Sequence, residues 1–404
     1  MQKKTAVHTA TIIGGITLCA IASAAMPSPV EKSHVTWSAS AGLGYDSNAY
    51  LSPSVPYVDY AALPSGSNPT VVPQVQSGFF VPLEMKLGAE NSPSRDIRLL
   101  GSADLDGHLF LDSDLNNANV YSLGLRAGSE FIVGRKGKIE NSVYTGIFAG
   151  KHKQVYFDRD SGTDKVTSGG ANLSERYSYT STGVEAEYKH RTGRVDYGLN
   201  GKYARNDYED PVVVSQLDHI LYKVGAELGV AIARPTKLGF AYHHTVRDYS
   251  DRHSRNAQGV YSSANPLLLY TYEDIGVTLR QRVSTDWVLH VDYDRTQRAD
   301  DYVAYNDYNQ NKYGARVLYA NGRFKGRLAL EHWTRDYPNA FAFDEAALGT
   351  KKTYDGNTAK LKAEWEQTKH ISLWGEAVYR AQNSTDLRYE YDRNLIMVGM
   401  SWAP

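Results

Sequence analysis

Apolar and polar residues alternate along most of this chain, in short stretches separated by turn and loop residues. From Trp287 to Asp294 the order is Trp-Val-Leu-His-Val-Asp-Tyr-Asp. Apolar side chains recur at every second position, and three of the four intervening residues are His or Asp. A period of two is that of a β-strand, whose successive side chains point to opposite faces. The pattern therefore predicts strands with one apolar and one polar face.

Sixteen such stretches can be placed along the chain. Eight are expected to ascend, at 35–46, 97–109, 139–150, 194–205, 237–248, 286–297, 323–335 and 371–382. Eight are expected to descend, at 77–89, 119–132, 174–189, 219–232, 269–283, 308–320, 354–367 and 388–402. The polypeptide is thus predicted to be all-β.

The connections between these stretches alternate in length. Those after descending strands are short turns, at 91–94, 134–137, 191–193, 234–236, 284–285, 321–322 and 368–370. Those after ascending strands are mostly longer and rich in Ser, Asn, Asp and Gly, the longest spanning 49–76. This asymmetry predicts a transmembrane antiparallel up-and-down β-barrel of about 16 strands (14–16), with short periplasmic turns and long extracellular loops. A soluble sandwich or propeller also has many short strands, but its inner face would be far less charged.

The N-terminal residues resemble an export signal. Lys3 and Lys4 precede an uncharged, largely apolar run over 9–21, and Ala22-Ser23-Ala24-Ala25 fits a cleavage site. A membrane anchor is the alternative, but the run is short and contains Gly14 and Gly15. We expect a signal peptide at 1–25, a periplasmic lead at 26–34, a single barrel domain at 35–404, and a location in the outer membrane of a Gram-negative bacterium.

The amino-acid composition limits the catalytic and binding chemistry expected of the mature chain. The single cysteine, Cys19, lies inside the predicted signal, so the mature chain would have no thiol for disulfides, catalysis or metal binding. The formal net charge of −1 becomes about −3 without Lys3 and Lys4, which does not indicate a nucleic-acid partner. Tyrosines number 30 against 10 phenylalanines, and an amphipathic ring suits both a membrane interface and a wet wall.

If the apolar residues face lipid, the alternate positions line a lumen. The predicted lumen wall carries both charge signs and comprises Arg98, Asp104, Asp106, Arg126, Glu130, Lys223, Glu227, Arg280, Arg282, Asp292, Asp294, Arg316, Arg327, Glu331, Glu376 and Arg380. Such a wall could hold water and conduct, or its charges could form cross-strand ion pairs that brace a wide barrel. The proline-rich first loop, with Pro53, Pro56, Pro64, Pro69 and Pro73, is the candidate constriction.

A weak repeat recurs where ascending strands end. It reads Arg205-Asn206-Asp207-Tyr208, Arg247-Asp248-Tyr249, Arg298 with Asp301-Tyr302, and Arg335-Asp336-Tyr337. We expect the tyrosines at the outer membrane interface with paired Arg and Asp beside them. The alternative is a rim that binds lipopolysaccharide phosphates or substrate.

Motifs for catalysis and cofactors are weak. His370-Ile371-Ser372 has the His-x-Ser spacing of some outer-membrane acyl hydrolases, but it falls in a predicted periplasmic turn. The rings of His243 and His244 point to opposite faces of one strand, so they cannot form a paired metal site. We therefore expect no enzyme activity, no cofactor and no metal.

Two terminal segments carry a family resemblance. Gly42-Leu43-Gly44-Tyr45-Asp46-Ser47-Asn48 and the last strand, from Tyr389 to Trp402, resemble the opening and closing strands of proteobacterial outer-membrane barrels in the putative β-barrel porin group, which includes barrels linked to exopolysaccharide export. They are also similar to the barrel half of surface lipoprotein assembly modifiers. Those modifiers normally carry a helical repeat domain before the barrel, whereas here only 26–33 precede the first predicted strand.

The chain ends Trp402-Ala403-Pro404 rather than on a terminal aromatic residue. We expect Gly399, Met400 and Trp402 to provide the assembly signal for the barrel insertion machinery.

Three functions follow from this reading. The first is a porin-like channel for solute passage or polysaccharide export, the second a closed barrel that serves as a surface binding or assembly protein, and the third a hydrolase. The expected partners are outer-membrane lipid and lipopolysaccharide, the insertion machinery, and polysaccharide or small solutes.

Cysteine labelling tests the topology, because the mature chain would contain no other thiol. A membrane-impermeant maleimide added to intact cells should label Ser65→Cys and Asn256→Cys, which lie in predicted extracellular loops. Lys136→Cys, in a predicted periplasmic turn, should react only after the cells are opened. Labelling with the opposite pattern would contradict the predicted orientation.

Overall fold

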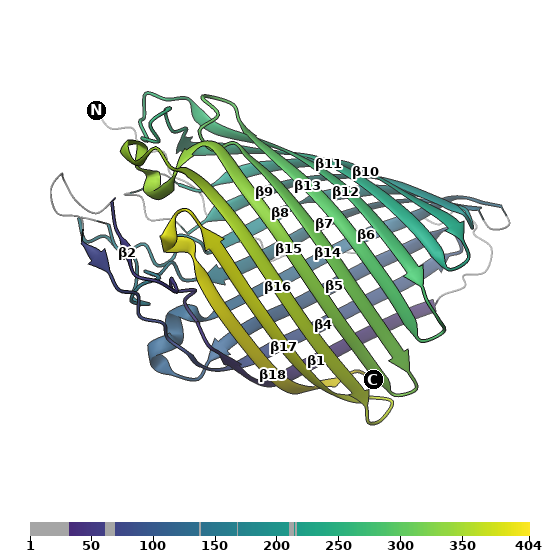
Figure 1. Cartoon of the computed structure of the whole chain (residues 1–404). Coiled ribbons are helices and arrows are strands. Elements are labelled where there is room, and N and C mark those ends of the chain that lie inside the picture. Colours follow the sequence, from purple (N-terminus) through teal and green to yellow (C-terminus); the bar gives the residue numbers. More distant parts are fainter. Residues whose placement is uncertain (1–31, 61–68, 137–138, 168, 210–213, 215) are drawn as a thin grey trace, which may run out of the picture.

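The computed structural model describes residues 32–60, 69–136, 139–167, 169–209, 214 and 216–404. The predicted signal peptide at 1–25 lies outside these residues, as does most of the lead at 26–34. The described residues form a closed antiparallel barrel of 16 strands, as the sequence predicts (Figure 1). The long connections gather at one end of the barrel and the short turns at the other, where the C-terminus lies.

The barrel strands, in chain order, are β1 (Lys32–Asp46), β4 (Gly78–Ser94), β5 (Ile97–Phe110), β6 (Val120–Lys136), β7 (Ile139–Gln154), β8 (Tyr179–Arg191), β9 (Val195–Tyr208), β10 (His219–Ala233), β11 (Thr236–His253), β12 (Leu267–Arg282), β13 (Trp287–Asp300), β14 (Tyr308–Asn321), β15 (Phe324–Phe341), β16 (Lys351–Glu366), β17 (Ile371–Ser384) and β18 (Tyr391–Trp402). Within the first long loop, β2 (Tyr57–Val58) and β3 (Thr70–Val71) form a separate small sheet.

Short 3₁₀ turns lie in the long loops. They are η1 (Ser113–Ala118), η2 (Ala342–Asp344), η3 (Ala346–Leu348) and η4 (Leu387–Tyr389). Among the described residues, no helix has the length and apolar character needed to cross a membrane.

Strand register separates the side chains into two faces. Leu279 lies opposite Val291, and Val291 lies opposite Ala315, so apolar residues continue from strand to strand on one face. Their neighbours Thr278 and Asp292 pair on the other face. That polar face encloses the interior, because side chains from β1 to β11 surround a single cavity there. The apolar face is therefore the outer, lipid-facing one.

Several boundaries differ from the prediction. β4 runs through the predicted turn at 91–94, and β6 continues to Lys136 in the predicted turn at 134–137, whose last residue lies outside the described ones. In each hairpin the pairing with the next strand continues past a register shift. β8 begins at Tyr179 rather than 174, since the buried Ser178 hydroxyl bonds the backbone of Gln154 and ends the preceding loop. β11 and β15 end five and six residues beyond the predicted 248 and 335, and the remaining boundaries agree within four residues.

The barrel closes between β1 and β18. At the long-loop end of this seam the carboxylate of Asp46 is fully buried. Both of its oxygens accept from Nε of Arg393, each at 3.0 Å, and Oδ2 also accepts from Nη2. Guanidinium and carboxylate thus meet in a forked arrangement across the joint between the first and last strands.

The same joint holds the start of the first loop. The side-chain amide of Asn48 donates to the carbonyl oxygens of Ser52 at 2.9 Å and Asp392 at 3.0 Å. The backbone N–H of Ser47 donates to the carbonyl of Asn394 at 2.9 Å, and the N–H of Asn394 donates to Oγ of Ser47 at 2.8 Å. The two segments that carry the family resemblance therefore form the closing joint.

Close packing explains two glycines in this seam. Gly42 lies opposite Gly399, and the Trp374 side chain covers both. A Cβ at Gly399 would lie 2.4 Å from both a Trp374 ring carbon and the carbonyl oxygen of Ala41, too close for any side chain. Trp374 is held over them by a 2.9 Å hydrogen bond from Nε1 to Oγ of Ser40.

Breaking the seam ion pair should destabilise the whole barrel. Asp46→Asn leaves the Arg393 guanidinium without its carboxylate in a buried site, and the expected loss is about 3 kcal/mol of unfolding free energy. Urea titration of the refolded protein in lipid vesicles measures it. Arg205→Gln is the control, because its ion pair with Asp207 is exposed and should contribute less than about 1 kcal/mol. Equal losses in the two variants would refute a special role for the seam.

Candidate pore and its loop cover

All sixteen residues of the predicted lumen wall lie on the inner face. The strand registers put Arg98 opposite Glu130, Asp292 opposite Gly314, and Asp294 opposite Lys312, all on the side away from the large apolar residues. The remaining members occupy the same face by alternation along their strands. The interior of the barrel is therefore lined by charged side chains.

Part of this wall is braced by ion pairs. Arg98 pairs with Glu130 at 3.1 Å, Arg316 with Asp292 at 3.3 Å, and Lys360 with Glu376 at 2.7 Å. Lys312 lies between Asp294 and Glu331, at 3.3 and 3.9 Å, and Glu227 lies 3.7 Å from His243.

The other half of the predicted wall is different. Within the described residues, the structure shows no oppositely charged group within 4.0 Å of Asp104, Asp106, Arg126, Lys223, Arg280, Arg282, Arg327 or Arg380. Bracing thus accounts for only some of the charges, and the others can face water in the interior.

A cavity of about 920 Å³ lies against the inner wall from β1 to β11. It brings together five predicted residues, namely Arg98, Arg126, Glu130, Lys223 and Glu227. Glu185, Glu187, Lys189 and Lys202 join them there, so the cavity has mixed charge. The predicted residues of β12 to β17 lie elsewhere on the wall.

The first loop packs inside the long-loop end. Tyr50 is fully buried and donates a 2.7 Å hydrogen bond to the carbonyl oxygen of Asp114. It belongs to an apolar cluster with Phe80, Phe110, Leu115, Val378, Leu395 and Met397. The strand members of this cluster all sit at inner-face positions of β4, β5, β17 and β18, so the loop base covers the inner wall beside the seam.

Farther along, the first loop contacts the loops of other strand pairs. The Tyr57 hydroxyl donates to Oδ2 of Asp160 at 2.6 Å, and the Tyr57 and Tyr60 rings lie 6.0 and 5.4 Å from the Phe343 ring. Burial, with the adjacent Asp160, raises the pKa of Tyr57 well above its usual range. Tyr57 therefore stays a neutral donor at physiological pH.

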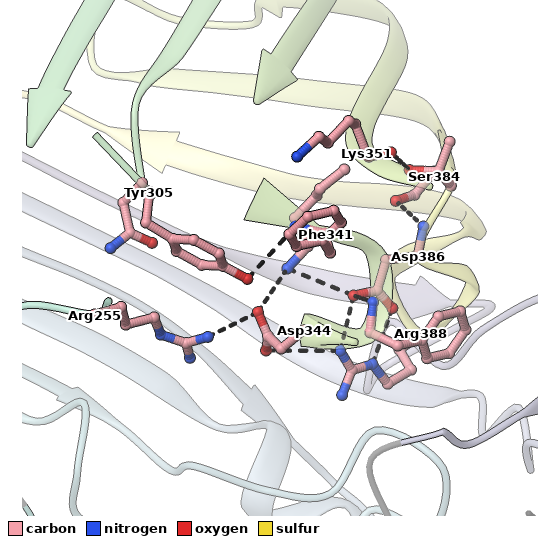
Figure 2. A network of polar contacts seen from close by, with 12 residues as sticks. Arg255, Tyr305, Phe341, Asp344, Lys351, Ser384, Asp386 and Arg388 are labelled. Atoms are coloured by element: carbon pink, nitrogen blue, oxygen red, sulfur yellow. Dashed lines mark hydrogen bonds and ion pairs between the residues drawn. The ribbon is translucent and has the colours of Figure 1, made fainter. Parts of the chain in front are cut away.

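A polar network connects the loops after β11, β15 and β17 (Figure 2). Asp386 is fully buried and accepts two hydrogen bonds from Arg388, at 2.9 and 2.8 Å, and one from the backbone N–H of Phe343 at 3.0 Å. Asp344 forms an ion pair with Arg255 of the loop after β11, with 2.8 Å between Oδ1 and Nη1. Together with the contacts of Tyr57, this network forms a cover over the long-loop end.

The inner wall below this cover carries a row of aromatic rings, one or more on each strand from β7 to β16 except β13, which we call the tyrosine arc. Successive ring centroids are 5.0 to 6.5 Å apart. In order around the wall the rings are His152, Tyr179, Tyr208, His219, Tyr249, Tyr270, Tyr272, Tyr308, Tyr337, Tyr354 and Tyr389. The arc spans β7 to β16 and ends in η4.

The arc overturns one prediction. Tyr208, Tyr249 and Tyr337 of the Arg-Asp-Tyr repeat were expected at the outer interface, but they lie on the inner face. The error could have been avoided, because Arg247 and Tyr249 are two residues apart and must share a face. Only Arg205 and Asp207 form the expected exposed pair, with 2.7 Å between Nε and Oδ1. The inner Arg and Tyr positions are functional candidates that sequence reasoning missed.

The histidine motifs of the sequence make ordinary structural contacts. His370 contacts the carbonyl oxygen of Ala403 at 3.2 Å in a short turn. His243 faces the interior, whereas His244 lies on the outer face with Nδ1 2.7 Å from Glu273. In the part of the chain that the structure describes, no group of three His, Asp or Glu side chains is placed to hold a metal ion.

The predicted assembly signal lies on β18. Met400 and Trp402 are about half exposed on the outer face, where Trp402 packs edge-on against Trp37 with centroids 4.9 Å apart. Gly399 instead faces inward beneath Trp374. Recognition of this strand by the insertion machinery remains a proposal.

No family model matches this chain, and no curated protein matches it. Among solved structures, the outer membrane channel DcaP of Acinetobacter baumannii is 12% identical, with a TM-score of 0.48 over 93% of this chain and 97% of that one. The anion-selective porin from Comamonas acidovorans is 11% identical, with a TM-score of 0.47 over 93% and 100%. Outer-membrane expressed OmpT of Vibrio cholerae is 9% identical, with a TM-score of 0.47 over 94% and 99%.

The closed register and the apolar outer face define the class of this protein. It is a 16-stranded transmembrane β-barrel of the outer-membrane type.

The loop cover should depend on the Asp386 carboxylate. Burial alone would raise the pKa of Asp386, but the hydrogen bonds and charge of Arg388, with Lys352 at 3.5 Å, hold it below its ordinary value of 3.8. A depressed pKa stabilises the folded cover above pH 3.8, and this contribution is lost as the pH falls through the folded-state value. Limited proteolysis should therefore show a closed cover from neutral pH to about pH 4 and new cleavage sites in 342–350 and 385–390 below that.

Asp386→Asn should expose the same sites at neutral pH. Glu345→Gln is a suitable control, because Glu345 is a neighbouring loop carboxylate that only caps η3. Cleavage in the control but not in Asp386→Asn would contradict the role given to Asp386.

Proposed function

We propose that this protein is a porin-like channel for polar solutes in the outer membrane, with its first loop as the constriction. The observation that carries the proposal is the first loop itself, whose base is buried against the inner wall of a charged barrel. A 16-stranded barrel is wide enough to enclose an aqueous channel unless loops fill it. Unpaired charges on the wall favour water over a dry core.

Passage of polysaccharide is the more specific form of this proposal. It is supported by the resemblance of the terminal segments to barrels linked to exopolysaccharide export. The aromatic lining also suits sugars. The ring faces of tyrosine can pack against sugar rings, and the tyrosine hydroxyl groups can form hydrogen bonds with those of the sugar.

A closed barrel that acts in surface binding or assembly is the second candidate. The interlocked loops favour it, since Tyr57, Asp160, Phe343, Asp344 and Arg255 connect separate loops over the interior. In that case the outward surface of the cover, rather than the lumen, would meet the partner.

Single-channel conductance in a planar lipid bilayer distinguishes the two candidates. Deleting 53–73 should enlarge the open steps if the first loop constricts a channel. The ends left by the deletion already lie close together. Oγ of Ser52 donates to the carbonyl oxygen of Gln74 at 3.2 Å, and the backbone N–H of Ala49 donates to the carbonyl oxygen of Gln76 at 2.8 Å. The Asn48 anchor remains in place.

Deletion of 262–264, an exposed stretch in the loop between β11 and β12, is the matched control and should leave conductance unchanged. Silence in the wild type and in both deletions, from barrels shown to be folded, would contradict the channel and support the closed barrel.

A further inference from the structure

Three arginines on the inner wall face tyrosines across the strands instead of carboxylates. The register puts Arg247 opposite Tyr270, Arg298 opposite both Tyr272 and Tyr308, and Arg335 opposite Tyr354. Arg298 stands on β13, where it fills the one position at which the tyrosine arc has no ring. Its guanidinium carbon lies 4.4 Å from the Tyr270 centroid and 4.5 Å from that of Tyr308.

In the part of the chain that the structure describes, no ion pair neutralises these arginines. Arg298 donates to the carbonyl oxygen of Asn306, and Arg335 donates to Oε1 of Gln310 at 2.7 Å. Both partners are neutral. Within the described residues, the structure shows no carboxylate within 4.0 Å of Arg247, Arg298 or Arg335, and the buried Nε of Arg247 has no hydrogen-bond partner.

Arg126, Arg280, Arg282, Arg327 and Arg380 of the inner wall also lack a carboxylate within 4.0 Å in the described residues, but none of them is seen there against an aromatic ring. A further group of inner-wall arginines is neutralised. Arg98, Arg316 and Arg393 each reach a carboxylate, of Glu130, Asp292 and Asp46. Arg247, Arg298 and Arg335 are partly buried. Partly buried charges without a counter-charge are costly, so a cluster of them is most stable when something else supplies it. Tyrosine faces attract the cations and fix their orientation but leave the net charge in place.

We propose that these three arginines and the tyrosine arc form a binding site for acidic oligosaccharides, whose sugar units carry carboxylates. The site rests on the proposed channel for access to the lumen. A planar guanidinium with free N–H groups matches a carboxylate in a forked geometry. In the arc Tyr249, Tyr270 and Tyr308 are buried, whereas Tyr272, Tyr337 and Tyr354 are partly exposed. The partly exposed rings suit the apolar faces and hydroxyl groups of sugar rings.

The placement of the arginines fits a chain-like ligand. They stand on β11, β13 and β15, so neighbours are two strands, or roughly 10 Å, apart along the wall. A polymer with regularly spaced carboxylates can meet several of them at once, whereas a small anion meets one. Multiple weak contacts along one ligand then add to its affinity.

Isothermal titration calorimetry on the refolded barrel in detergent tests the site without requiring conduction. The probes are an oligogalacturonate, a neutral malto-oligosaccharide of the same length, and citrate. We expect binding of the oligogalacturonate alone, and Arg298→Gln should raise its Kd about 10-fold or more, as expected for loss of a charge-assisted contact.

Arg295→Gln is the matched control, because Arg295 stands on the same strand but on the exposed outer face. It should leave the Kd unchanged. Arg298→Lys retains the charge but not the planar fork and should bind with intermediate affinity. Heat-modifiable mobility on gels confirms that each variant is folded.

Equal binding of the neutral oligosaccharide would overturn the role of charge, and equal binding of citrate would overturn the role of the sugar. Absence of oligogalacturonate binding by a conducting barrel would refute the site and leave the channel standing. Binding by a barrel that does not conduct would support the site and refute the channel.

Discussion

The structure depends on closure of the sheet between β1 and β18. A strand edge left open in lipid would expose backbone groups that have no water to bond, so a membrane-spanning sheet must pair its first strand with its last. Here the backbone pairing is reinforced at one end by the buried Asp46–Arg393 ion pair and, farther down the seam, by Trp374 over two glycines. These contacts join residues almost the whole length of the chain apart.

The same joint positions the loops. Asn48 bonds both Ser52 in the first loop and Asp392 at the start of β18, so the loop leaves the barrel in a fixed direction toward the interior. From there Tyr50 buries itself on the inner wall, and Tyr57 reaches the loops of distant strands. Barrel closure and the shape of the mouth are thus parts of one arrangement.

Two groups of inner-wall arginines have different neighbours. Some are paired with carboxylates, which braces neighbouring strands and removes their charge from the interior. Arg247, Arg298 and Arg335 lie against the rings of the tyrosine arc, and Arg298 and Arg335 also donate to neutral oxygens, so their charge remains. The difference lies in the cross-strand neighbour, and it places three arginines against aromatic rings in the long-loop half of the lumen.

The sequence by itself determined the strand number, the order of the strands and the face of every predicted wall residue, because a period of two and the alternation of turns and loops are local properties. It wrongly assigned 91–94 and 134–136 to turns, because pairing in those two hairpins continues past a register shift and prolongs the strands. Only the tertiary structure decided which arginines have carboxylate partners, that Arg298 fills the gap in a row of rings, and that Asp46 meets Arg393. Those contacts depend on the register between strands and on closure of the barrel. The spacing of residues along one strand determines neither of them.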